Sequence, residues 1–303
     1  FVSNSTEIVN IDGNGLTVTS KDATINSITV GKGANSVAGN TVLGESALDA
    51  AVTGGNNTAI GKEALTALTS GTQNTAVGKD ALKANTTGVE NAAFGAIALD
   101  ANTEGDKNTA IGRSALGFNT TADHNTAIGY NSLLYNTTGT KNTAVGSMAL
   151  DANTTGDHNT AVGIDSLGAN TTGASNVAIG DRALQTNSTA SYNTGIGFKA
   201  LELNTTGTEN TAVGREALAA NTTASYNTAV GDQALDANTT GTRGVAVGNN
   251  ALTANTTGDY NIAIGDSALG SNTTASNNIA VGRNSLVLNT TGTQNVAVGA
   301  MAL

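Results

Sequence analysis

The sequence predicts an all-β fold, a parallel β-solenoid (a β-roll or β-helix) with coils of 17 residues. A unit containing Asn-Thr-Ala-Val-Gly, Ala-Leu and Asn-Thr-Thr-Gly first starts at Asn40 and last starts at Asn295. The separation of 255 residues equals 15 × 17, so sixteen copies begin in one register without insertion or deletion. The chain has 38 Gly at recurring places and no Pro, which is typical of regular turns. Such regularity predicts stacked coils, whose residues are numbered here from position 1, the opening Asn.

Residues 1–39 lie outside the repeat and are expected to form a short β segment that begins or caps the solenoid. Strands are predicted over residues 16–19 and 24–30, and Asp12-Gly13-Asn14-Gly15 predicts a tight turn. A cap is needed because an open solenoid end exposes unpaired backbone groups. The predicted domains are therefore residues 1–39 and residues 40–303, whose sixteenth copy is truncated. We expect the sequence to be part of a longer chain.

Within each copy, positions 2–4 are predicted to form a strand, because two β-branched residues there share one face. Position 5 is Gly from Gly44 to Gly299 and should mark a positive φ or a close backbone approach. A second short strand is expected near positions 8–11, and the Asn-Thr-Thr-Gly turn closes the coil. Helical repeats are disfavoured because known ones run to about 33 residues or more.

The interior is expected to contain columns of Val or Ile and of Leu, with Ala where the walls come closest. Coils should rise about 4.8 Å each, giving a rod on the order of 70 Å. The Asn columns at positions 1 and 12 should form amide ladders. One Val and one Leu per coil make a thin core, so we predict that several copies of the chain pack together through the Ala-rich face.

Composition argues against several classes of function. The net charge is −10 and only 12% of residues are charged, so no basic stripe for nucleic acid is expected. No apolar run approaches the ~20 residues that span a bilayer, so we expect no membrane insertion in this segment. Cysteine is absent, which excludes disulfides.

Catalytic, cofactor and metal sites are not expected, and we predict that the protein is not an enzyme. His124 and His158 both fall at position 17, two copies apart, and are interpreted as solvated turn residues. The repeat offers no evident pocket. The acidic residues at position 16 are scattered over the coils and are interpreted as solvated turn carboxylates: Asp106, Asp123, Asp157 and Asp259.

Three tyrosines form the one candidate contact strip. Tyr192, Tyr226 and Tyr260 all occupy position 17, in every second coil. Exposed aromatic residues are favoured in binding sites, so the strip is a candidate for sugar contact. The alternative, which we favour, is that position 17 tolerates any residue, since it also holds Glu209 and Arg243.

The repeated Asn-x-Ala-Ile/Val-Gly strand resembles the haemagglutinin-type repeats of trimeric autotransporter adhesin (YadA-like) heads over residues 40–303. The resemblance implies a homotrimer of left-handed parallel β-rolls. The period of 17 is longer than that of a typical adhesin-head coil. The longer unit, with Ala-Leu and Asn-Thr-Thr-Gly, looks more like repeats of bacteriophage tail-fibre proteins.

The tail-fibre resemblance implies a structural shaft in the virion that projects a receptor-binding tip and contributes to attachment to the host cell. Its partners would be the other two chains of the trimer, further fibre or virion proteins, and a host receptor, either glycan or protein. The alternative is a bacterial cell-surface adhesin head that binds host matrix or cells directly. A remote alternative is an ice-binding solenoid, because positions 13 and 14 would present about two Thr hydroxyls per coil at ~4.8 Å.

Overall fold

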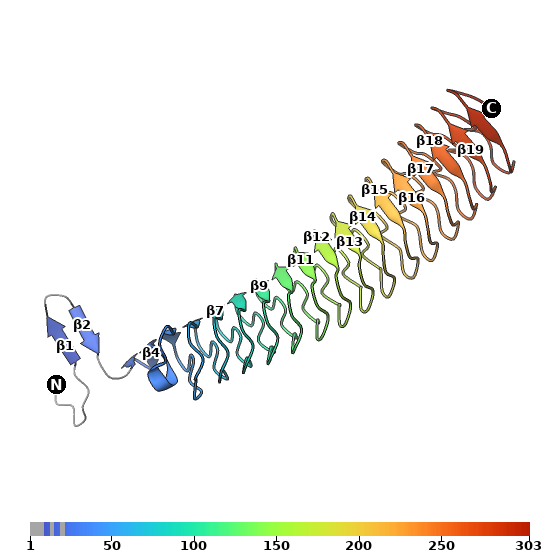
Figure 1. Ribbon diagram of the computed structural model, residues 1–303. Helices are drawn as coiled ribbons and strands as arrows, with labels where there is room; N and C mark the ends of the chain where they lie inside the picture. Colours follow the sequence, from blue (N-terminus) through green and yellow to red (C-terminus); the bar gives the residue numbers. More distant parts are fainter. Residues whose placement is uncertain (1–8, 13–14, 19–21) are drawn as a thin grey trace. The chain divides into compact units, whose positions relative to one another are not determined.

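The fold is an all-β parallel β-solenoid, as the repeat predicts. The computed structural model describes residues 9–12, 15–18 and 22–303. Each 17-residue copy makes one coil and contributes one strand, and within each compact unit the strands of successive coils lie side by side (Figure 1). The chain divides into two compact units, residues 1–131 and residues 132–303, and each is described by itself.

Two hairpins precede the coils. Strand β1 (Val9–Asp12) pairs antiparallel with β2 (Gly15–Val18), while the predicted turn residues Gly13 and Asn14 lie outside the described residues. Strand β3 (Ala23–Ile25) pairs antiparallel with β4 (Ile28–Gly31). The prediction of one strand over residues 24–30 was therefore wrong. Asn26 and Ser27 adopt positive φ angles of 49° and 67°, which make the two-residue turn of a hairpin.

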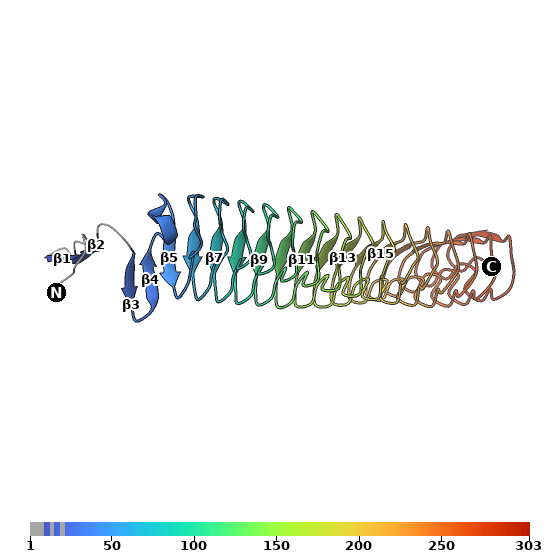
Figure 2. The ribbon, with the colours of Figure 1, turned by 90° about the horizontal axis from the view of Figure 1, so that it is seen from below.

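The β3–β4 hairpin covers the first edge of the parallel sheet. Strand β4 pairs antiparallel with β5 (Thr41–Gly44), with Val30 opposite Leu43 (Figure 2). A short 3-10 helix, η1 (Ala34–Ser36), follows β4, and the Ala34 N–H donates to the Leu48 carbonyl at 3.1 Å. These bonds occupy backbone groups that the first coil would otherwise expose.

The coils contribute sixteen strands in all, β5 to β20. In the first unit β5 is followed by β6 (Thr58–Ile60), β7 (Thr75–Val77), β8 (Ala92–Phe94), β9 (Thr109–Ile111) and β10 (Thr126–Ile128). In the second unit they are β11 (Thr143–Val145), β12 (Thr160–Val162), β13 (Val177–Ile179), β14 (Thr194–Ile196), β15 (Thr211–Val213), β16 (Thr228–Val230), β17 (Val245–Val247), β18 (Ile262–Ile264), β19 (Ile279–Val281) and β20 (Val296–Val298). Within each unit, neighbouring strands pair in parallel at an offset of one copy, as Thr58 does with Thr75.

The interior consists of small residues around one leucine per coil. The Ala at position 3, the Ala or Ser at position 8 and the Leu at position 9 are buried, as Ala76, Ala81 and Leu82 show in one coil. The prediction that the Val or Ile of position 4 points inward was wrong, because positions 2 and 4 lie on the outer face of the sheet. The Ala side chains of positions 3 and 8 are buried inside each chain. The prediction that an Ala-rich face packs against other chains was therefore wrong too.

The predicted second strand near positions 8–11 is absent from the described coils. That part of each coil is a succession of turns, in which the residues at positions 7 and 9 both adopt positive φ, for example Asp80 at 58° and Leu82 at 51°. The backbone of position 9 is held by the next coil, since the Leu82 N–H donates to the Ala98 carbonyl at 3.0 Å. Two left-handed residues bend the chain back sharply, which leaves no room for an extended segment.

The expected asparagine ladders are present in both units. At position 1, the Asn74 N–H donates to Asn57 Oδ1 at 2.9 Å. At position 12, Asn102 Nδ2 donates to Asn85 Oδ1 at 3.0 Å. Both columns converge on the carbonyl of position 15, because Gly105 O accepts from Asn91 Nδ2 at 2.7 Å and from Asn102 Nδ2 at 3.0 Å. These buried amides are therefore satisfied by the chain itself, as buried polar groups must be.

Glycine at position 5 is required on two grounds. Gly146 has a φ of 140°, in the region that favours glycine. A Cβ there would also lie 2.3 Å from the carbonyl oxygen of Gly163 in the next coil. The predicted positive φ and close approach are both confirmed.

Candidate functional site

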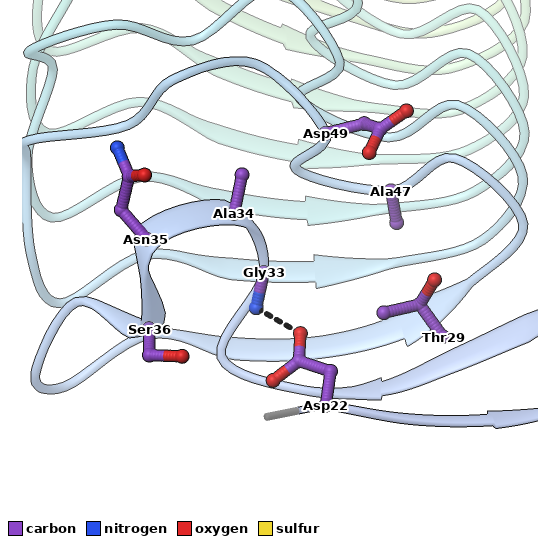
Figure 3. Close-up of a pocket in the computed structure, with 8 residues that line it drawn as sticks. All are labelled: Asp22, Thr29, Gly33, Ala34, Asn35, Ser36, Ala47 and Asp49. Atoms are coloured by element: carbon purple, nitrogen blue, oxygen red, sulfur yellow. Dashed lines mark hydrogen bonds between the residues drawn. The ribbon is translucent and has the colours of Figure 1, made fainter. Parts of the chain in front are cut away.

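A hollow of about 500 Å³ lies where the β3–β4 hairpin meets the first coil. Asp22, Gly33, Ala47 and Asp49 are among its lining residues (Figure 3). The Asp22 carboxylate accepts the Lys32 N–H at 2.6 Å and also the Gly33 N–H. The Asp22 carboxylate thus fixes the backbone that follows β4. The hollow is therefore best explained as part of the cap.

The position-16 carboxylates have a structural role that the sequence interpretation missed. Asp106 Oδ1 accepts the N–H of Val89, at position 16 of the preceding coil, at 2.8 Å, and Asp123 Oδ1 accepts the Asp106 N–H at 2.7 Å. Ser191 Oγ does the same for the Ala174 N–H at 3.0 Å. Two further bonds of this kind in the second unit are those that Asp157 Oδ1 accepts from the Thr140 N–H at 2.6 Å and Asp259 Oδ1 accepts from the Thr242 N–H at 2.7 Å. Most residues at position 16 are therefore short side chains that carry an acceptor oxygen, with Val89 and Ala174 among the exceptions.

Half-buried carboxylates occupy position 10 in several coils, as at Asp100, Asp151 and Asp236. A hollow of about 440 Å³ is lined by Asp151, Asp165 and Gly168, among others. Burial, and then the negative charge of Asp165, raise the pKa of Asp151 above the ordinary range of an aspartic acid. Burial likewise raises the pKa of Asp100 and of Asp236. Nowhere in residues 22–303 do three His, Cys, Asp or Glu side chains gather as metal ligands would.

The tyrosine strip, defined here as Tyr192, Glu209, Tyr226, Arg243 and Tyr260, runs along the second unit at position 17. Tyr192, Tyr226 and Tyr260 are 66%, 48% and 51% exposed. Each backbone is anchored to position 16 of the preceding coil, as in the bonds from the N–H groups of Tyr226 and Tyr260 to the carbonyls of Thr208 (3.1 Å) and Thr242 (3.0 Å). The strip is therefore a row of exposed side chains on a firmly held backbone.

Arg243 is sandwiched between two of the tyrosines. Its guanidinium carbon lies 5.0 Å from the ring centre of Tyr226 and 5.4 Å from that of Tyr260. Its Nη1 also donates to the Tyr260 hydroxyl at 3.2 Å. These are the distances of cation–π contacts.

The neighbouring slot, between Tyr192 and Tyr226, holds a carboxylate in place of the guanidinium. Glu209 occupies position 17 of the coil between them and lines an open hollow of about 500 Å³ together with Tyr192 and Thr211. Among the residues that the structure describes, none forms an ion pair or side-chain hydrogen bond with the Glu209 carboxylate. The strip thus contains one filled slot, between Tyr226 and Tyr260, and an open hollow beside Tyr192 and Glu209.

Sequence reasoning identified the tyrosines but missed their partners. The sequence interpretation treats Glu209 and Arg243 as signs that position 17 is unconstrained, whereas Arg243 contacts two rings. The 17-residue spacing of Tyr226, Arg243 and Tyr260 was a usable signal, because one period places side chains in adjacent coils. His124 and His158 are exposed at position 17 of their coils, as expected.

The threonine columns differ between positions 13 and 14. At position 13 the hydroxyl donates to the carbonyl of the next coil, as Thr154 Oγ1 does to Thr171 O at 3.0 Å. At position 14 the Thr is exposed, as at Thr155. The surface therefore offers fewer unengaged hydroxyls than the two per coil assumed for ice binding.

No family model matches the chain, and no curated protein matches it. No helix within the described residues has the length and apolar character of a membrane span.

Proposed function

We propose that this chain is a structural shaft segment of a bacteriophage tail fibre, assembled as a homotrimer, which projects a receptor-binding tip and contributes to host attachment. The observation that carries the proposal is the unbroken 17-residue register. Within each unit successive coils are joined by parallel strand bonds. From Asn85 onward they are also joined by two asparagine columns, of which the position-1 column is interrupted at Gly244; Asn170 Nδ2, for example, donates to Asn153 Oδ1 at 2.9 Å. Repeated identical layers of this kind give stiffness without a large core.

Assembly is supported by the apolar column on the outer face of the sheet. The Ile or Val of position 4 is partly exposed along both units, with Ile179 at 39% as an example. Because the Ala columns are inside the coil, this outer column is the surface through which we propose that chains pack. A row of such side chains is typical of an interface rather than of a water-facing sheet.

The assembly is tested by native mass measurement at low concentration. A trimer is expected for the unaltered chain, whereas a stably folded monomer would contradict the proposal. Replacing Ile179, Val230 and Ile264 together with Asp should yield folded monomers, because three like charges per chain would meet at the interface. Ile164→Asp is the control, since Ile164 is 51% exposed but lies at position 6, outside the column.

The tyrosine strip favours the second candidate, a bacterial surface adhesin head that binds host matrix or cells directly. The two candidates differ in the flanking sequence of the full-length protein. A virion-attachment domain would support the fibre, and a membrane β-barrel anchor would support the adhesin. Replacement of Tyr192, Tyr226 and Tyr260 with Ser should abolish binding of the chain to glycans or cells if the strip is an adhesive surface.

A further inference from the structure

We propose that the open slot formed by Tyr192, Glu209 and Tyr226 binds the guanidinium group of an arginine side chain presented by another protein. The proposal goes beyond a shaft function, because it assigns a specific interaction to the side of the solenoid. It rests on the contrast between two adjacent slots of the same strip, one of which is already filled by an arginine of this chain.

The filled slot shows what the geometry accepts. Arg243 lies one coil after Tyr226 and one coil before Tyr260, and its guanidinium carbon is 5.0 Å and 5.4 Å from the two ring centres. Two coils correspond to about 10 Å, the thickness of a ring–cation–ring stack. The strip therefore holds a planar cation between tyrosines two coils apart.

The open slot repeats this spacing with the opposite charge at its centre. Tyr192 and Tyr226 are also two coils apart, and Glu209 takes the place that Arg243 takes in the next slot. Arg243 lies over the Tyr226 ring from the later coil, and we infer from this that the opposite face of the ring is directed to the coil of Glu209. Tyr192 and Glu209 border an open hollow of about 500 Å³, so an incoming side chain has access.

The charge of the slot selects a cation. The Glu209 residue is exposed, and its carboxylate forms no ion pair or hydrogen bond with residues 22–303. The whole chain has a net charge of −10, which favours the approach of basic partners. A guanidinium fits better than an ammonium, because it is planar, stacks on aromatic faces and pairs with a carboxylate through parallel hydrogen bonds.

The test uses the full chain and a short peptide, acetyl-Gly-Gly-Arg-Gly-Gly-amide, at millimolar concentration. Saturation-transfer NMR with irradiation of the tyrosine ring protons should show transfer to the arginine δ-methylene. The citrulline peptide, which has the same shape without the charge, should show transfer weaker by about threefold or more, as loss of cation–π and ion-pair contacts implies. Equal transfer to both peptides would overturn the proposal.

Variants locate the site. Glu209→Gln and Tyr192→Ser should each lower the apparent affinity for the arginine peptide by about threefold or more. Glu90→Gln is the matched control, because Glu90 is also exposed at position 17 but has Gln73 and Lys107 in the adjacent coils. A loss with Glu90→Gln equal to that with Glu209→Gln would show mere attraction to an acidic protein and contradict the proposal.

A gain-of-function variant keeps the test independent of damage to the fold. Arg243→Glu converts the filled slot into a second open slot between Tyr226 and Tyr260, so the number of bound arginine peptides per chain should rise from one to two. Glu209→Arg should fill the first slot internally and abolish binding. Unchanged stoichiometry in Arg243→Glu, with circular dichroism like that of the unaltered chain, would overturn the proposal.

Discussion

At the scale of single residues, the unusual feature is the left-handed backbone that many ordinary side chains adopt. Positions 7, 9 and 17 of each coil have positive φ, although position 7 holds residues as different as Glu63, Ile97 and Arg182. The left-handed region costs an L-residue about 1–2 kcal/mol. The bonds and burial of neighbouring coils impose this conformation, since the residue type at position 7 does not favour it.

Ile97 is the least suitable of these residues, because it is β-branched and has a φ of 52°. Ile97→Asn should stabilise the protein by about 1 kcal/mol, since Asn tolerates this conformation. The midpoint of denaturant unfolding measures the effect. Ile164→Asn is the control, because Ile164 lies at position 6 without a positive φ, and it should bring no gain. Equal effects of the two changes would contradict the explanation by strain.

At the scale of the coil, the asparagine ladder of position 1 has one gap within residues 40–303. Gly244 replaces the Asn of position 1, and its N–H donates to Asn227 Oδ1 at 2.8 Å. In the next coil, the Asn261 N–H has no hydrogen-bond acceptor within residues 22–303. The Gly258 carbonyl, at position 15, accepts a hydrogen bond from Asn255 Nδ2 at 3.0 Å. The second hydrogen bond, which an Asn side chain at position 244 would donate, is missing.

Gly244→Asn should therefore restore two hydrogen bonds and raise the free energy of unfolding by about 1–3 kcal/mol. Thermal and denaturant unfolding measure the gain. Gly244→Ala is the matched control, since it adds the Cβ without an amide. If the Asn variant is no more stable than the Ala variant, the ladder does not contribute in the way that its geometry implies.

The sequence allowed the coil length, the strand at positions 2–4, the asparagine ladders and the glycine corner to be predicted, because each depends on a column of one or two residue types. The direction of the strand faces could not be predicted in the same way. Alternation shows that positions 2 and 4 share a face but does not say which face is inside. The narrow coil is filled by one leucine and two small residues, as at Leu184, Ala178 and Ala183, so the larger Val and Ile must lie outside. In the tyrosine strip, the ring–guanidinium contacts join residues of adjacent coils that are 17 positions apart in the sequence. Interpreting each residue separately does not reveal such contacts.

At the scale of the whole molecule, partial burial changes the pKa values of some of the acidic side chains that give the chain its negative charge. The pKa values of Asp100, Asp151 and Asp236 are raised, mainly by burial. A raised pKa in the folded state means that these groups favour folding below the unfolded value of about 3.9, and that this contribution is lost as pH rises through the folded values. At neutral pH, their charged forms therefore weaken the fold.

Replacing Asp100, Asp151 and Asp236 together with Asn should raise the Tm at pH 7, and the difference from the unaltered chain should shrink towards pH 4. Thermal unfolding by circular dichroism at several pH values measures it. The control replaces three exposed carboxylates, Glu90, Glu104 and Glu209, with Gln, which changes the net charge equally. A rise of the same size in the control would assign the effect to general repulsion rather than to burial.

The constant offset of 17 residues between bonded partners also constrains how the gene can change. A deletion or duplication of one whole copy rejoins every asparagine, leucine and glycine with its equivalent, whereas any other number of residues misaligns all columns at the junction. Unequal recombination between the similar copies therefore adds or removes complete coils, so natural variants of this chain should differ in copy number by integers.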